Sequence, residues 1–120
     1  MRLMSFSMTE QAVRDRTKSV TRRLGWKNLR TGEELRAVRK VMGRKHGEPI
    51  VDLARIRVVS VRREPLSDIG DADVEREGYP GRTASWFVDK FCDAMGCSEN
   101  TEVTRIEFEY VNPLGTEEGK

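Results

Sequence analysis

A chain of 120 residues has room for one modest hydrophobic core, so we expect a single domain. Charged residues make up 35% of the chain, but apolar residues recur at ordered intervals, which argues against disorder outside the ends. No apolar run approaches the roughly 18 residues needed to cross a bilayer, and the first residues lack the apolar core of a signal peptide. We therefore expect a cytoplasmic protein with no membrane contact, and we favour a monomer.

The formal net charge of +2 conceals an uneven distribution of charge along the chain. Residues 1–45 hold 13 Lys and Arg against 4 Asp and Glu, whereas residues 46–120 hold 9 against 16. If the two halves stay apart in the fold, the basic half forms a face that binds phosphates. A solvated surface without a binding role is the alternative interpretation.

Three expected elements precede residue 24. Residues 3–8 alternate weakly between apolar and polar side chains, which predicts a short strand. Residues 9–13 have the pattern of a capped helical turn, and residues 18–23 are predicted to be extended because of their Ser-Val-Thr content.

A hairpin is expected in the middle of the chain. After a turn at residues 29–33, a strand is predicted at residues 34–42 and a longer one at residues 50–62. The connecting loop, residues 43–49, is bounded by glycine and proline and holds His46, which we interpret as a turn residue. Two extended runs joined in this way predict antiparallel pairing.

The hydrophobic period changes from two to nearly four after residue 64. A short acidic helix is predicted at residues 71–77, closed by Gly78, and a better one at residues 83–95. Along the second helix an apolar stripe recurs at helical spacing, with Trp86 on its flank: Phe87, Phe91, Ala94 and Met95. We interpret this stripe as core and expect the helix to make no ligand contact.

The last predicted strand, residues 104–110, has the clearest alternation in the chain. The order of elements predicts an α+β fold in which the strands form a small mixed β-barrel with helices on its flank. The domain is expected to span residues 1–111, followed by a polar tail at residues 112–120.

The two cysteines do not indicate a metal site or a disulfide framework. Cys92 and Cys97 are accompanied by a single histidine, so four zinc ligands of this kind cannot be assembled. We interpret both as reduced packing residues, and we expect no metal and no cofactor.

The string RTKSVTRR, from Arg16 to Arg23, carries the most chemical information. It places Lys18 and the Thr21 hydroxyl three residues apart in a run of guanidinium groups. Neighbouring positive charges lower the cost of deprotonating a lysine, and a neutral lysine beside a hydroxyl would form a base and nucleophile pair. A solvated basic edge strand is the alternative.

Three features in this order resemble the ASCH domain family, whose fold is similar to that of PUA domains, small β-barrels that handle RNA. The family motif Gly-x-Lys-x-x-Glu/Thr-x-Arg is matched by RTKSVTRR, with Arg16 at the glycine position. A turn with glycine and an acid is matched by Thr31-Gly32-Glu33, and a final Ile-Glu-Phe strand by residues 106–108. The match covers roughly residues 3–111.

The threonine at the fourth motif position resembles the bacterial N4-acetylcytidine amidohydrolases. This resemblance implies a catalytic set of Lys18, Thr21 and Glu77, with Glu75 as a rival for the third position. Thr21 would be the nucleophile and Lys18 its general base, and Glu77 would protonate the departing amine and then activate water. Substrate binding would fall to three arginines, Arg16, Arg22 and Arg23.

Strand geometry constrains this constellation. Side chains alternate along a strand, so Thr21 would share one face with Arg23, and Lys18 would share the other with Arg22. Lys18 and Thr21 can converge only where the chain bends or bulges. The sequence thus leaves two main functions open: hydrolysis of an N4-acylated cytosine in a nucleoside or RNA, and a binding module that holds RNA or a modified base without chemistry. A third, weaker alternative is a structural or protein-interaction role that uses the acidic helix at residues 71–77.

Overall fold

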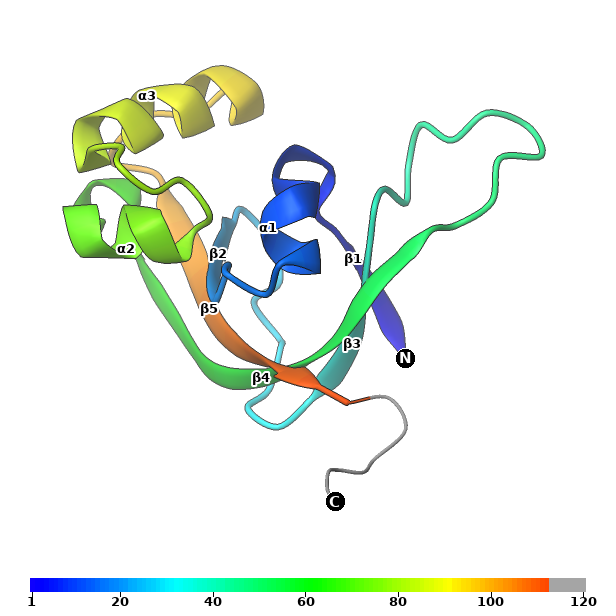
Figure 1. Cartoon of the computed structure of the whole chain (residues 1–120). Helices are drawn as coiled ribbons and strands as arrows, with labels where there is room; N and C mark the ends of the chain where they lie inside the picture. The colour runs from blue at the N-terminus through cyan, green and yellow to red at the C-terminus, as the bar shows by residue number, and fades with distance from the viewer. Residues whose placement is uncertain (113–120) are drawn as a thin grey trace.

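The computed structural model describes residues 1–112, so the predicted tail lies outside the described residues except for Asn112. A five-stranded mixed sheet in the order β1-β3-β4-β5-β2 curls into a half-barrel (Figure 1). The strands are β1 (Arg2–Ser5), β2 (Val20–Arg23), β3 (Glu34–Val38), β4 (Asp52–Pro65) and β5 (Glu102–Val111). The α+β class is confirmed, and the predicted barrel is open because β1 and β2 form its two edges.

The predicted hairpin is present, and its strands differ in length from the expectation. β3 and β4 pair antiparallel, but β3 stops at Val38, where the register shifts. β4 continues to Pro65. Beyond Arg57, which pairs with the first residue of β3, it is paired with β5 alone. A second register shift between Val58 and Ser60 marks a bulge, and bulges bend a strand and increase its twist. Figure 1 shows β4 curving strongly along its length.

Short helices cover the open side of the half-barrel. The N-terminal ones are the 3-10 helix η1 (Ser7–Thr9) and α1 (Glu10–Arg14), so the first predicted strand ends at Ser5. The others are η2 (Leu66–Asp68), α2 (Asp71–Arg76) and α3 (Ala84–Met95). Thr83 caps the N-terminus of α3, because its side chain accepts a hydrogen bond from the Trp86 N–H. Gly96, in the left-handed conformation, caps the C-terminus.

Apolar side chains form two clusters rather than one core. The larger fills the half-barrel and includes Phe6, Ile56 and Phe108. The smaller lies under α2 and α3 and includes Phe87 and Phe91. Phe87 and Phe91 are buried as predicted, whereas Ala94 and Met95 of the same stripe are exposed. The candidate site lies between the two clusters.

Candidate active site

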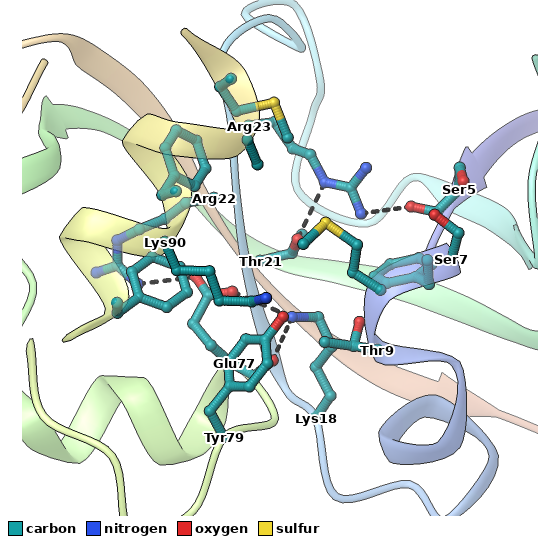
Figure 2. A pocket seen from close by; sticks show the side chains of 16 residues that line it. Ser5, Ser7, Thr9, Lys18, Thr21, Arg22, Arg23, Glu77, Tyr79 and Lys90 are labelled. Atoms are coloured by element: carbon teal, nitrogen blue, oxygen red, sulfur yellow. Dashed lines mark hydrogen bonds and ion pairs between the residues drawn. The ribbon is translucent and has the colours of Figure 1, made fainter. Parts of the chain in front are cut away.

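A cavity of about 220 Å³ opens between the half-barrel and α3 (Figure 2). Phe6 contributes a wall from the larger cluster, and Phe87 and Phe91 contribute one from the smaller cluster. The charged and hydroxyl side chains of its lining include Lys18, Thr21, Arg22, Arg23, Glu77 and Lys90. The three residues of the predicted catalytic set therefore line one cavity.

Lys18 lies in the segment that precedes β2, outside the paired region of the strand. Its side chain is 3% exposed, and its Nζ donates to Glu77 Oε1 over 3.1 Å and to the Glu77 carbonyl oxygen. Burial lowers the pKa of Lys18, against the opposing effect of the Glu77 carboxylate. Burial and contact with a carboxylate are properties of a functional lysine, and a solvated edge strand has neither.

Glu77 is the residue directly after α2, and the tight approach of α2 to α1 holds it in place. Gly78 has a φ of +105°, and a Cβ at this position would lie 3.0 Å from the Cβ of Ala12. Only glycine fits both the backbone conformation and the space. This turn brings Glu77 to Lys18, whereas Glu75 is exposed and outside the cavity lining. The structure therefore favours Glu77 over Glu75 as the partner of Lys18.

Arg22 is engaged by carboxylates on the α2 side of the cavity. Its Nη1 donates to Glu77 over 3.0 Å, and its Nη2 donates to Glu64 over 2.9 Å and to Asp73 over 2.7 Å. The side chain is 1% exposed. Buried charges are stable only when they are paired, and three carboxylates satisfy this one. Arg22 thus borders the cavity while it ties β2 to β4 and α2.

Asp73 joins this network to β5. Arg105 donates to both of its oxygens, over 2.8 and 3.0 Å, and this contact together with Arg22 holds the pKa of Asp73 far below its ordinary value. Arg22 and Arg105 are register partners on neighbouring strands, so one aspartate bridges two cations that would otherwise repel each other.

Thr21 and Arg23 share the opposite face of β2, as alternation predicts. Arg23 Nε donates to Thr21 Oγ1 over 3.0 Å, and its Nη2 donates to the carbonyl oxygen of Ser5 over 2.7 Å. The guanidinium lies 4.8 Å from the centroid of the Phe6 ring. Burial lowers the pKa of Arg23 to about 10.

Arg16, which stands at the motif's glycine position, lies outside the cavity lining. Its φ of +62° is the left-handed conformation that glycine adopts most readily. The Arg16 guanidinium packs 5.4 Å from the centroid of the Tyr110 ring. The side chain therefore does not crowd the cavity.

The sequence interpretation missed the wall that α3 supplies. Lys90, Ala94 and Met95 line the cavity together with the two phenylalanines, so the expectation that α3 stands apart from the site is wrong. The signal was present in the spacing, because residues 87, 90, 91 and 94 share one face of a helix, and that face carries a lysine. A lysine within an apolar stripe indicates that this helix face is partly exposed to solvent.

Within residues 1–112, no group of three or more His, Cys, Asp and Glu side chains is placed to hold a metal ion. No helix in the same range is long and apolar enough to cross a membrane.

Solved structures place this architecture among known folds. The chain matches an ASCH domain from Lactobacillus crispatus JV V101 with a TM-score of 0.63 and 13% identity, covering 91% of this chain and 78% of that one. The chain has an ASCH-like fold. No family model and no curated protein matches its sequence.

Two further structures share the ASCH-like fold of this chain. Protein EF3133 from Enterococcus faecalis V583, of family DUF984, matches with a TM-score of 0.64 and 15% identity over 92% of this chain and 79% of that one. The hypothetical protein PH0355 matches with a TM-score of 0.63 and 12% identity over 92% and 97%. At such identities the likeness concerns the fold alone.

Proposed function

We propose that this ASCH-like domain acts on modified nucleosides or RNA by hydrolysing the amide of an N4-acylated cytosine. The observation that carries the proposal is the position of Lys18, which is buried at a cavity that also holds Thr21 and is fixed by Glu77. A lysine with a lowered pKa and a hydroxyl that line the same cavity supply the groups of a base and its nucleophile.

The size and chemistry of the cavity support a ligand whose enclosed part is no larger than a nucleoside. Its volume of about 220 Å³ is below the roughly 300–1,000 Å³ of pockets for drug-sized molecules. Its lining combines polar side chains, such as Lys18, Thr21 and Arg23, with the apolar rings of Phe87 and Phe91. A pyrimidine with an acyl group on its exocyclic nitrogen has polar edges and an apolar end to match.

The reaction can be written with the residues that line the cavity. Neutral Lys18 takes the proton of the Thr21 hydroxyl as Oγ1 attacks the acyl carbonyl carbon. Lys18 then gives this proton to the cytosine nitrogen as the C–N bond breaks, which leaves an ester on Thr21. Water attacks the ester carbonyl carbon and loses a proton to Lys18, the ester C–O bond breaks, and Lys18 returns the proton to Thr21. The products are cytosine and the carboxylic acid.

The contacts of Glu77 favour a supporting part in this sequence. Both carboxylate oxygens accept hydrogen bonds, one from Lys18 and one from Arg22. A carboxylate in this position orients the lysine and stabilises the ammonium that forms during the reaction. We therefore assign the proton transfers to Lys18, in place of the proton donation by Glu77 that the resemblance implied.

A product assay tests the proposal. The purified protein is incubated with N4-acetylcytidine, and cytidine and acetate are measured over hours. We expect both products in equal amounts from the native protein and none from Lys18→Ala. If the native, folded protein releases no cytidine from acetyl, hexanoyl or benzoyl derivatives, the hydrolase proposal is wrong.

One observation favours the alternative, a binding module without chemistry. The Lys18 ammonium is held by the Glu77 carboxylate, which favours its charged form, so Lys18 must lose a proton before it can act as a base. If the protein is a binding module, cytidine derivatives bind to it and are not hydrolysed. Calorimetry of N4-acetylcytidine, followed by recovery of the intact compound, distinguishes the two.

A further inference from the structure

The cavity holds more positive charge than its own carboxylate neutralises. Within the described residues its lining includes one carboxylate, that of Glu77, and four cationic side chains: Lys18, Arg22, Arg23 and Lys90. Glu77 pairs with Lys18 and Arg22, and Arg22 is further neutralised by carboxylates behind the cavity. Arg23 and Lys90 therefore face the cavity with no carboxylate of their own.

Arg23 is held by neutral oxygens. Its hydrogen bonds go to the hydroxyl of Thr21 and the backbone carbonyl of Ser5, and the ring of Phe6 lies beside it. These contacts orient the guanidinium without neutralising its charge, and burial lowers the pKa of Arg23. A partly buried cation in such surroundings is stabilised when an anion enters the cavity.

Lys90 approaches the cavity from α3, on which it is the sole cation. Its Nζ lies 5.7 Å from the ring centroid of Tyr79 and 5.6 Å from that of Trp86. Across residues 1–112 no carboxylate lies within ion-pair distance of it, although Asp89 precedes it in the chain. Figure 2 shows the Lys90 side chain extending from α3 toward Tyr79. The aromatic faces hold the ammonium in place and leave it charged.

We propose that Arg23 and Lys90 bind a phosphate group, so that the ligand of this cavity is a cytidine phosphate rather than a neutral nucleoside. The phosphate belongs either to a free nucleotide or to a cytidine within RNA, and both present the same oxygens to the two cations. The identity of the base rests on the proposed function, whereas the phosphate site rests on the charges alone.

Calorimetry with the whole native chain tests the phosphate site. The probes are cytidine, cytidine 5′-monophosphate and a short single-stranded oligocytidylate. We expect the monophosphate to bind roughly tenfold or more tightly than cytidine at low salt, since a hydrogen bond to a charged group is stronger than a neutral one. Lys90→Gln should remove most of this difference. The matched control is Lys27→Gln, an exposed lysine outside the cavity, which should change neither affinity.

The outcomes separate this inference from the proposed function. Equal affinities for cytidine and its monophosphate, or equal effects of the Lys90 and Lys27 variants, overturn the phosphate site, even where N4-acetylcytidine is hydrolysed. A monophosphate preference that depends on Lys90 supports the site, even where no acylated compound is turned over. Tighter binding of oligocytidylate than of the monophosphate identifies RNA as the source of the phosphate, and the reverse identifies a free nucleotide.

Discussion

Arg23 Nε lies 3.0 Å from the Thr21 hydroxyl oxygen and donates a hydrogen bond to it. One lone pair of that oxygen is thereby occupied, and the hydroxyl proton is free to be donated elsewhere. The positive charge beside the oxygen also stabilises the alkoxide that would form on deprotonation. A residue first assigned to substrate binding therefore also positions the proposed nucleophile.

Variants of Thr21 should separate its hydroxyl from its shape. Thr21→Val keeps the branched side chain of a buried strand position and removes the oxygen, so we expect a folded protein with no turnover of N4-acetylcytidine. Thr21→Ser should retain activity. Mass spectrometry of the native protein quenched during turnover should find an acetyl group on Thr21. Full activity in Thr21→Val would remove Thr21 as the nucleophile.

Arg22 should matter for stability far more than a surface arginine with similar pairs. Arg22→Ala leaves three carboxylates without their shared partner, and breaking a buried pair in this way costs roughly 3–5 kcal/mol of unfolding free energy. The control is Arg57→Ala, which breaks ion pairs to Glu34 and Glu109 on an exposed face and should cost at most about 1 kcal/mol. Urea unfolding measures both. Equal losses would mean that the network stabilises no more than surface pairs do.

The carboxylate of Asp73 should make the fold sensitive to acid. Its pKa in the folded protein lies below the ordinary value of 3.8, so its contribution to stability is complete above that pH and is lost as the pH falls below it. Unfolding free energies at a series of pH values should therefore drop in acid. Asp73→Asn should be less stable at neutral pH and should show a shallower acid dependence. The exposed Asp68→Asn serves as control, and an unchanged slope in Asp73→Asn would contradict the assignment.

Phe91 has two roles in the structure, since it packs in the smaller cluster and lines the cavity. Phe91→Ala should cost roughly 3–5 kcal/mol of unfolding free energy, because the side chain is buried. Met95→Ala, at an exposed position on the same wall, should cost far less. Thermal unfolding measures the difference. Similar stabilities of the two variants would show that the cluster does not depend on Phe91.

Local patterns sufficed to predict much of the fold. The β3–β4 hairpin, α3 and the last strand follow from hydrophobic period and from glycine, and these elements are present with shifted ends. The ends shifted because tertiary pairing determines them: β4 runs on to Pro65 since β5 offers it a partner. Such pairing joins segments that are distant in sequence, so local propensity does not predict where it ends.

The candidate site was predicted in part, through the motif rather than through geometry. Lys18 and Glu77 are 59 residues apart, and the resemblance alone placed them together. Alternation correctly grouped Thr21 with Arg23, because it requires only a regular strand. The lysine within the α3 stripe was only a partial signal for Lys90, because the same stripe packs as core or borders a cavity according to the distance between α3 and the half-barrel. That distance is set by the packing of two clusters.

The rate of N4-acetylcytidine hydrolysis by Lys18→Arg, compared with that of the native protein, tests the central claim most directly. Arginine keeps a positive charge at the site but does not give up its proton, so it cannot replace a lysine that acts as a base. We expect the native protein to release cytidine and the variant, folded by circular dichroism, to be slower by roughly 10²–10⁴-fold. A variant that hydrolyses N4-acetylcytidine at the native rate would show that Lys18 is not the base and would contradict this account of the site.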